Sequence, residues 1–257
     1  MSLITIQNAS RFFDDARRGT QVKALDDVSL SVNRNEFLCL LGPSGCGKST
    51  LLNMIAGFDK PSRGTVTVGG RPVTAPGVDR GVVFQQPTLM PWLTVWENVA
   101  FHLTMRGASK AERRKKAQHY VDMVGLRGFE NHFPSELSGG MNQRVGIARA
   151  LLMNPEVILM DEPFGALDEQ TKMDMHAELV RIWRESQSTI VFVTHGIEES
   201  LALGTHIAVM SARPGRIREL IEVDLPRPRD STSPRFNDYK RHILSLLRPE
   251  PADAVHA

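Results

Sequence analysis

A glycine-rich run, placed between an apolar stretch and a helix-forming stretch, limits the fold of this 257-residue chain more than any other feature. The run is Gly42-Pro43-Ser44-Gly45-Cys46-Gly47-Lys48-Ser49-Thr50, which fits the phosphate-loop pattern G-x-x-x-x-G-K-S/T. Residues 37–41 before it are all apolar and predict a buried strand, and residues 48–57 after it predict a helix that ends at Gly57. Strand, loop and helix in this order predict an α/β fold built around a nucleoside triphosphate site.

The loop residues have the chemistry that a triphosphate needs. The glycines allow successive backbone amides to turn toward phosphate oxygens, and the start of the following helix adds partial positive charge. Lys48 supplies a full cation to the β- and γ-phosphates, and the Ser49 hydroxyl is a suitable Mg²⁺ ligand. The expected nucleotide contacts are Gly42, Pro43, Ser44, Gly45, Cys46, Gly47, Lys48, Ser49 and Thr50.

A second apolar run, residues 157–160, ends in two acids, Asp161 and Glu162. The carboxyl end of a strand is where an open α/β sheet presents its ligands. Asp161 is therefore a candidate for the Mg²⁺ shell of a phosphate-loop enzyme. A solvated acidic turn after a core strand is the alternative reading.

A third run, Leu137-Ser138-Gly139-Gly140-Met141-Asn142-Gln143, opens a predicted helix over 139–153. Ser138 is a suitable N-cap, and the two glycines permit close approach of a ligand to the backbone. A helix N-terminus with free amides is an anion site. A single ATP does not need two anion sites that are so far apart in one chain, although a capped helix without a ligand is the alternative.

The composition leaves the compartment and the partners to be inferred. The net charge of +2 gives no overall field for nucleic acid, so no nucleic-acid partner is expected. The longest apolar runs are strand-sized, well short of the ~20 residues of a membrane span, and residues 1–7 resemble no secretory signal. The two cysteines, Cys39 and Cys46, suit a reduced compartment. We expect a cytoplasmic protein whose membrane role, if any, comes through a partner.

Periodicity predicts an α/β pattern that a mostly helical block interrupts. Strands are predicted over 3–7, 28–32, 37–41, 65–68, 81–84, 157–160, 189–194, 207–211 and 217–223, and helices over 48–57, 94–102, 110–124, 139–153, 168–185, 197–203 and 236–247.

With the glycine run and the run from Leu137 together, the chain resembles the ATP-binding cassette family over nearly its whole length. The resemblance implies a phosphate-loop NTPase core with an antiparallel β subdomain and an inserted α-helical subdomain. It places an ATPase domain at residues 1–225, with the helical insertion at about 86–155, and a C-terminal extension at 226–257.

The resemblance also implies a shared nucleotide. In the family, residues equivalent to Ser138, Gly139 and Gly140 reach the ATP held by a second copy of the subunit. The phrase Ala166-Leu167-Asp168 matches the loop that joins the two sites, with Asp168 at the interface. Two ATP molecules would then lie between two head-to-tail protomers.

Catalytic roles follow from the same resemblance. Glu162 would polarise the attacking water, Gln85 would touch Mg²⁺ and the water, and His195 would contact the γ-phosphate. Together with Lys48, these residues form the expected catalytic set. Gly196 departs from the family, which usually has Asp after this histidine.

The adenine ring is expected against an aromatic residue of the first sheet, where the family usually has Tyr. Phe12 and Phe13 fit this place, and Phe13 is the expected residue because stacking needs only a ring face. Two ordinary core residues are the alternative.

Cys46 lies inside the loop beside Lys48 and the helix start, surroundings that favour a thiolate. Alkylation of Cys46 would then block ATP binding, and ATP would protect it. A small side chain that fills a tight loop is the alternative.

Several phrases are similar to importer ATPases, and most closely to the nitrate, sulfonate and taurine branch. This similarity implies an ATPase that drives uptake of a small solute through a separate integral membrane permease, with a periplasmic or lipid-anchored solute-binding protein as an indirect partner. The expected location is peripheral, on the cytoplasmic face of the inner membrane. A soluble ATPase of the same family in DNA repair or translation is the alternative. The matching phrases are 76–85, 89–92, 133–136, 161–168, 211–217 and 224–229.

Overall fold

The computed structural model describes residues 2–15, 19–165 and 167–248, and packing divides the chain into two compact units. The first unit comprises residues 1–75 and 192–257, and the second comprises residues 76–191. The two units are described separately. Ala166 and residues 249–257 of the expected extension lie outside the described residues.

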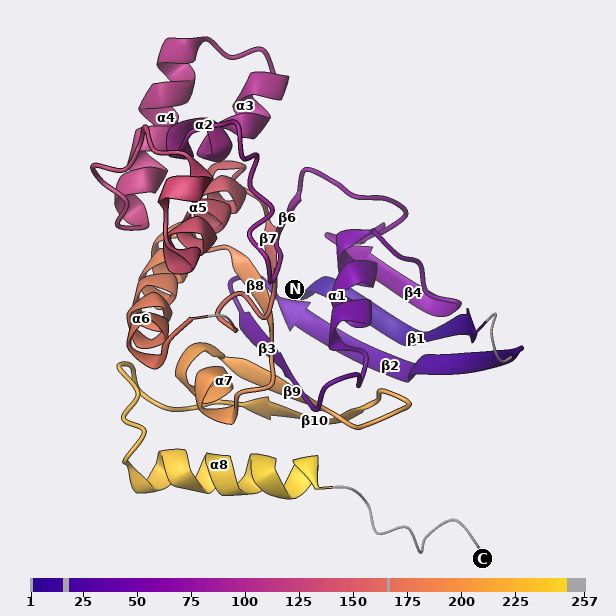
Figure 1. Cartoon of the computed structure of the whole chain (residues 1–257). Helices are drawn as coiled ribbons and strands as arrows, with labels where there is room; N and C mark the ends of the chain where they lie inside the picture. Colours follow the sequence, from indigo (N-terminus) through magenta and orange to yellow (C-terminus); the bar gives the residue numbers. More distant parts are fainter. Residues whose placement is uncertain (1, 16–18, 166, 249–257) are drawn as a thin grey trace, which may run out of the picture. The chain divides into compact units, whose positions relative to one another are not determined.

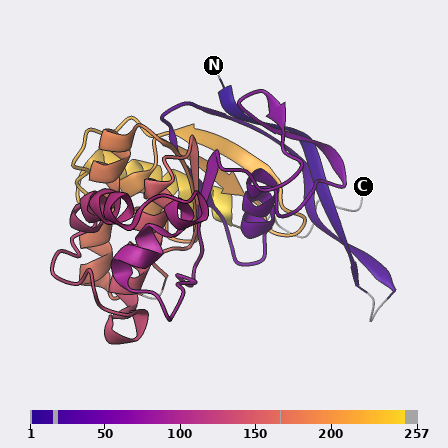
Figure 2. The same ribbon diagram turned by 90° about the horizontal axis from the view of Figure 1, so that it is seen from above.

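The first unit contains an antiparallel sheet with the strand order β2-β1-β4-β5. Its strands are β1 (Ser2–Asp15), β2 (Thr20–Asn33), β4 (Arg63–Val68) and β5 (Arg71–Pro72). Figure 2 shows β1 and β2 as a long twisted pair. Both strands are longer than predicted because their distal halves pair without a regular apolar alternation: Phe12 lies opposite Lys23, and Phe13 opposite Val22.

The same unit holds the strand that leads into the glycine run. This strand, β3 (Phe37–Leu41), is buried at every residue and pairs in parallel with β9 (His206–Met210), which pairs antiparallel with β10 (Ile217–Glu222). Strand β8 (Thr189–Thr194) begins in the second unit and ends in the first, because the boundary between the units falls at residue 192. The helices of this unit are α1 (Lys48–Ala56), α7 (Ile197–Leu203) and α8 (Pro234–Leu247), and α8 packs on α7 and β9 (Figure 1).

The second unit combines two parallel strands with a group of helices. The strands are β6 (Arg80–Val83) and β7 (Val157–Asp161). Helices α2, α4 and α5 pack on one another, and α5 also packs on β6 (Figure 1). The helices are α2 (Val95–Val99), α3 (Phe101–Met105), α4 (Lys110–Met123), α5 (Gly139–Leu152) and α6 (Glu169–Ser186), with a 3₁₀ turn at Pro134–Glu136.

One helix that the sequence predicts as continuous is divided in the structure. The helix expected over 94–102 is two short helices, α2 and α3, because Ala100 leaves the helical region with φ −85° and ψ 6°. A capping box of Thr94 and Glu97 begins α2. Among the described residues, no helix is both long and apolar enough to cross a lipid bilayer.

Candidate functional site

The glycine run forms a tight turn between β3 and α1, as predicted. Gly45 and Gly47 have φ angles of 74° and 97°, and Gly47 caps α1 without a side chain. Lys48 is only 5% exposed, and its Nζ donates to the carbonyl oxygens of Gly42 (2.8 Å) and Pro43 (3.1 Å). The lysine is thus folded over the loop, with its ammonium group held at the loop's own backbone.

Gly47 is required by its surroundings as well as by its φ angle. A Cβ atom at this position would lie 2.6 Å from Leu25 Cδ2 and 3.0 Å from the Ala24 carbonyl oxygen. Leu25 is fully buried, so the neighbouring chain cannot easily give way. The close approach keeps the loop's amides near the start of α1, where the helix dipole favours anions.

The structure contradicts the expected thiolate at Cys46. The side chain is 1% exposed, and burial raises the pKa of its thiol more than the neighbouring Lys48 lowers it. Cys46 is therefore a buried thiol at neutral pH, and its small volume suits the tight loop.

His195 follows β8 and is exposed in the first unit. Its flanking residues are held by a buried network, in which the Thr194 hydroxyl donates to the Glu199 carboxylate and the Gly196 amide donates to Thr194 Oγ1 at 2.9 Å. Glu199 is 8% exposed and belongs to α7. The network fixes the backbone on both sides of His195.

The other end of α7 is anchored by two arginines that follow β10. Arg227 Nη1 donates to the Ala202 carbonyl oxygen at 2.7 Å, and Arg229 Nη1 donates to the Gly204 carbonyl oxygen at 2.6 Å. Cations at a helix C-terminus complement its dipole. Residues of the expected C-terminal extension therefore fix the helix that begins next to His195.

Both candidate adenine platforms lie on β1 and have cations over their rings. Phe13 is 41% exposed, with the Arg11 guanidinium carbon 4.6 Å from its ring centroid. Phe12 has Lys23 Nζ at 5.5 Å and the Arg63 guanidinium carbon at 5.7 Å. Adjacent residues of a strand point to opposite faces, so at most one of the two rings faces a given ligand.

In the second unit, the acidic strand end and the glutamine come together. In the β6–β7 register, Val83 lies opposite Met160, so Gln85 and Glu162 each lie two residues beyond this last pair. A Cβ atom built on Gly165 would lie 3.8 Å from Gln85 Nε2 and 4.0 Å from Glu162 Oε2. The amide and the carboxylate therefore face the same point beyond the strand ends.

Glu162 also has an uncommon backbone conformation. Its φ angle is +43°, a region that non-glycine residues other than Asn and Asp seldom occupy. The Gly165 amide donates to the Glu162 carbonyl oxygen at 3.1 Å and closes the turn. Strain of this kind persists only where the surroundings enforce it, and it is concentrated at functional sites.

The run from Leu137 starts α5 as predicted. Ser138 is the N-cap, and its Oγ accepts the Met141 amide at 3.3 Å. Ser138 and Gly139 are exposed, whereas Gly140 is buried, and a Cβ atom on Gly140 would lie 3.2 Å from Leu167 Cδ2. The helix start is thus open to solvent at its first two residues and tightly packed at the third.

Asp168 is the N-cap of α6. Its Oδ1 accepts the Thr171 amide at 3.0 Å, and this bond lowers the pKa of the Asp168 carboxyl group. The residue therefore has a structural role in addition to any role at an interface.

Three polar residues that the sequence did not single out for a role organise this unit. Gln143, only 3% exposed, donates through Nε2 to the Phe84 carbonyl oxygen at 3.1 Å and so ties α5 to the residue before Gln85. Asn98 and Arg149 hold the segment that follows Gln85. Gln143 lies within the run from Leu137, and Arg149 follows it closely. The sequence does not show which backbone groups these two side chains bind.

Each unit therefore carries its own share of the expected residues. The glycine loop, Lys48, Phe13 and His195 belong to the first unit, and the remaining expected residues belong to the second: Gln85, Ser138, Gly139, Gly140, Asp161, Glu162 and Asp168.

Comparison with known proteins agrees with this site. Residues 25–165 match the family model described as ABC transporter. The nitrate import ATP-binding protein NrtD of Synechocystis sp. is 46% identical over 94% of both chains. The taurine import ATP-binding protein TauB of Rhizobium johnstonii is 48% identical over 95% of this chain and 96% of that protein. A dimeric ATP-binding cassette in a post-hydrolysis state with ADP and Pi aligns with a TM-score of 0.76 at 36% identity, covering 86% of this chain and 98% of that chain.

The chain belongs to the ABC transporter ATP-binding family, and its fold is the ABC ATPase fold. ATP-binding proteins of ABC transporters are ATPases that drive transport, and this confirms the family, the fold class and the ATPase activity expected from the sequence.

Proposed function

We propose that this chain is the ATP-hydrolysing subunit of an importer that takes up a small solute such as nitrate, a sulfonate or taurine. The observation that carries the proposal is its similarity, along nearly the whole chain, to import ATP-binding proteins for nitrate and taurine. The solute crosses the membrane through a separate permease, so no residue of this chain selects it.

In the proposed reaction, the glycine loop binds the phosphates and Lys48 moves from its own loop carbonyls to the β- and γ-phosphates. Ser49, Gln85 and Asp161 would hold Mg²⁺, since they would supply the hydroxyl, amide and carboxylate oxygens that this ion prefers. Glu162 orients the attacking water, and His195 stabilises the γ-phosphate. Phe13 stacks on the adenine.

The second proposed element is a nucleotide shared by two copies of the chain. The start of α5 has no acidic residue in its first turn, and Ser138 and Gly139 are exposed, so this end can receive an anion from outside. Gly140 and Asp168 complete the contact in trans. A related cassette is dimeric in its post-hydrolysis state, which supports a homodimer here.

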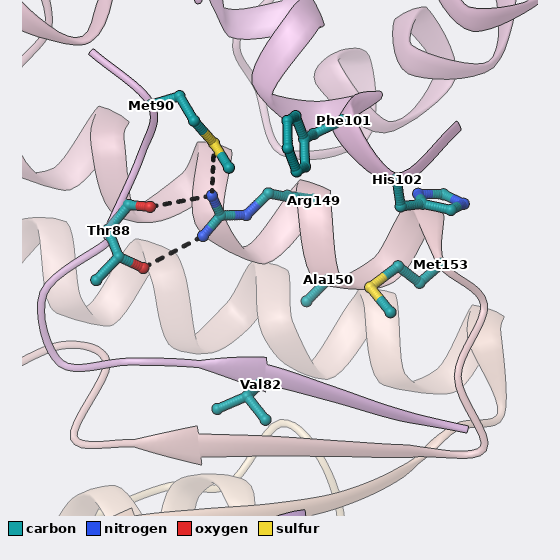
Figure 3. A pocket seen from close by; sticks show the side chains of 8 residues that line it. All are labelled: Val82, Thr88, Met90, Phe101, His102, Arg149, Ala150 and Met153. Carbon is teal, nitrogen blue, oxygen red and sulfur yellow. Dashed lines mark hydrogen bonds between the residues drawn. The ribbon is translucent and has the colours of Figure 1, made fainter. Parts of the chain in front are cut away.

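The permease is proposed to dock on the second unit. A pocket of about 330 Å³ lies between the segment around Met90 and helices α3 and α5 (Figure 3). The surface beside it exposes Val78 (69%) and Met105 (68%), and Trp92 is 72% exposed. Arg106 lines the adjoining hollow, so the occupant is a short permease helix with apolar residues and one carboxylate.

These assignments imply a peripheral protein on the cytoplasmic face of the inner membrane, with a solute-binding protein acting on the other side of the permease. We retain an ATPase domain over 1–225 with a helical insertion at about 86–155, because α2 to α5 all fall within that insertion. Residues 226–257 form the C-terminal extension.

The variant Glu162→Gln tests the proposal, with Glu169→Gln in the first turn of α6 as a control. We expect Glu162→Gln to bind ATP, to lose turnover by about a hundredfold or more and to form a stable dimer with MgATP, as measured by light scattering. The control should hydrolyse ATP normally. A Glu162→Gln protein that stays monomeric at saturating MgATP contradicts the shared nucleotide.

A second experiment separates the importer from the soluble alternative. Membranes from cells that carry a tagged copy of the chain are solubilised, and the chain is purified through this tag. An importer subunit should bring an integral membrane protein with it, whereas a DNA-repair ATPase should be stimulated by DNA and bring none.

A further inference from the structure

Thr88 has a backbone conformation that its side chain disfavours. Its φ angle is +36°, and a β-branched residue at positive φ is a true outlier. Of the six other described non-glycine residues at positive φ, four are Asn or Asp, which tolerate this region. Thr88 lies in the short segment Pro87–Met90, three residues after Gln85. Something must therefore hold this segment in place.

Arg149 makes the contacts that hold it. Its Nη1 donates to the Thr88 carbonyl oxygen at 3.1 Å and lies 3.7 Å from Met90 Sδ. Its Nη2 donates to the Pro87 carbonyl oxygen at 3.2 Å and to Thr88 Oγ1 at 3.4 Å. Figure 3 shows the guanidinium group facing Thr88 and Met90. One side chain thus contacts four groups on three residues of the segment: two carbonyls, a hydroxyl and, more weakly, a thioether.

The chemistry of Arg149 makes this attachment firm. Burial lowers the pKa of its guanidinium group, yet an arginine remains charged at any physiological pH. Hydrogen bonds from a charged donor are stronger than those between neutral groups. Because these acceptors all come from one segment, releasing the segment would leave a half-buried cation without them.

The positions of Ser138 and Arg149 at opposite ends of α5 point to a role for Arg149. Arg149 lies in the last turn of α5, and Ser138 caps the first. The segment it holds begins two residues after Gln85 and forms a wall of the pocket, to which Thr88, Met90 and Arg149 all contribute. A rigid helix therefore connects the proposed contact with the partner's ATP to the proposed permease site.

We propose that Arg149 is a positioning residue that fixes the segment Pro87–Met90 to α5, so that the segment and the pocket wall move with this helix. The inference rests on the proposed function for its meaning in transport, but the attachment itself can be tested without a permease. If Arg149 releases the segment, Thr88 relaxes to an ordinary backbone region and the pocket loses its shape.

The test is hydrogen-exchange mass spectrometry on the full chain with Arg149→Met. Arg184→Met is the control, since Arg184 is an exposed arginine in the last turn of another helix of the same unit. We expect amides of residues 86–92 to exchange about tenfold faster in Arg149→Met, while peptides from β6 and β7 are unchanged. The control should match the wild type. Unchanged exchange at 86–92 overturns the proposal.

A variant of Thr88 distinguishes positioning from general stability. Thr88→Gly removes the backbone strain, so in the Arg149→Met background it should restore slow exchange at 86–92 at least in part, by about threefold. A merely structural loss would not be rescued by a glycine. If Arg149→Met exchanges faster throughout the unit, Arg149→Lys decides the case: it keeps the cation but cannot span the three oxygens. A local increase at 86–92 then supports the proposal, and its absence overturns it.

The coupling is measured in the Glu162→Gln background with and without MgATP. With Arg149 present, MgATP should change exchange at 86–92, and Arg149→Met should abolish this change while the ATP dissociation constant stays within about twofold. An equal response in both proteins overturns the coupling. Failure of Glu162→Gln to dimerise would instead count against the proposed function, so the two failures are distinguishable.

Discussion

Asn98 offers the sharpest test of how the segment beyond Gln85 is built. The residue is fully buried in α2, and its side chain makes four hydrogen bonds. Oδ1 accepts the Met90 amide at 2.9 Å. Nδ2 donates to the carbonyl oxygens of Met90 (3.1 Å), Leu93 (2.9 Å) and Thr94 (3.1 Å). Three acceptors around one amide nitrogen mean that the donor cannot be replaced by an acceptor.

The substitution Asn98→Asp changes the shape of the side chain very little but replaces the donor amide nitrogen with an oxygen. Asn98→Ala should cost about 3 kcal/mol of unfolding free energy, because four bonds are each worth about 1 kcal/mol and some of the freed carbonyls regain water. The new carboxyl group of Asn98→Asp must stay protonated among the carbonyls, which costs about 1.4 kcal/mol for each pH unit above its ordinary pKa near 4. At pH 7 this term alone is about 4 kcal/mol.

The pH dependence has a definite sign. The folded state raises the pKa of the new carboxyl group, so the stability it contributes is present below its unfolded pKa and is lost as pH rises. Relative to Asn98→Ala, the Asn98→Asp protein should therefore gain about 2.7 kcal/mol between pH 7 and pH 5.

The assay is urea unfolding followed by tryptophan fluorescence, since all three tryptophans (Trp92, Trp96 and Trp183) lie in the second unit. Asn131→Asp is the matched control, because Asn131 is exposed and only accepts a bond, from Arg114. That control should change the unfolding free energy by less than about 0.5 kcal/mol. The reasoning fails if Asn98→Asp is as stable as Asn98→Ala at pH 7, or if their difference does not shrink at pH 5.

Three further predictions concern the nucleotide site. Gly47→Ala should weaken ATP binding at least tenfold and cost about 2 kcal/mol or more of stability, because the backbone is at φ 97° and the new Cβ meets Leu25; normal binding and stability would contradict the loop geometry. Ser138→Arg should abolish turnover and leave nucleotide binding by the isolated chain within about twofold, whereas loss of that binding contradicts the contact in trans. Cys46 should react with iodoacetamide at pH 8 at least about tenfold more slowly than glutathione does, since the thiol is buried and its pKa is raised; comparable rates would show that the loop opens.

The sequence predicted the elements around the glycine loop closely because local signals agree there. An unbroken apolar run specifies β3, and Gly57, in the left-handed region, ends α1 where expected. The apolar strand before Asp161 and the Ser138 cap of α5 were likewise predicted from a few neighbouring residues. In each case the pattern and the capping residue are adjacent in the chain, so no distant contact had to be known.

Long-range partners explain what the sequence could not predict. The distal parts of β1 and β2 show no regular apolar alternation and owe their strand form to their pairing with each other. The break at Ala100 separates two helical stretches with no proline or glycine to mark it. Cys46 has cationic surroundings in sequence, yet burial dominates its pKa. Such outcomes depend on how closely the rest of the fold surrounds a residue.

The segment beyond Gln85 illustrates this dependence most clearly, because two helices hold it from different sides. Asn98 of α2 binds its end at Met90, and Arg149 of α5 binds its start at Pro87 and Thr88. The two helices pack on each other. With both ends fixed and Thr88 already strained, the segment has little slack to absorb a shift of α5 relative to α2. Any such shift must therefore either break the Arg149 contacts or displace the pocket wall. If the contacts hold, a small movement of α5 would displace the wall and so reach a docked partner.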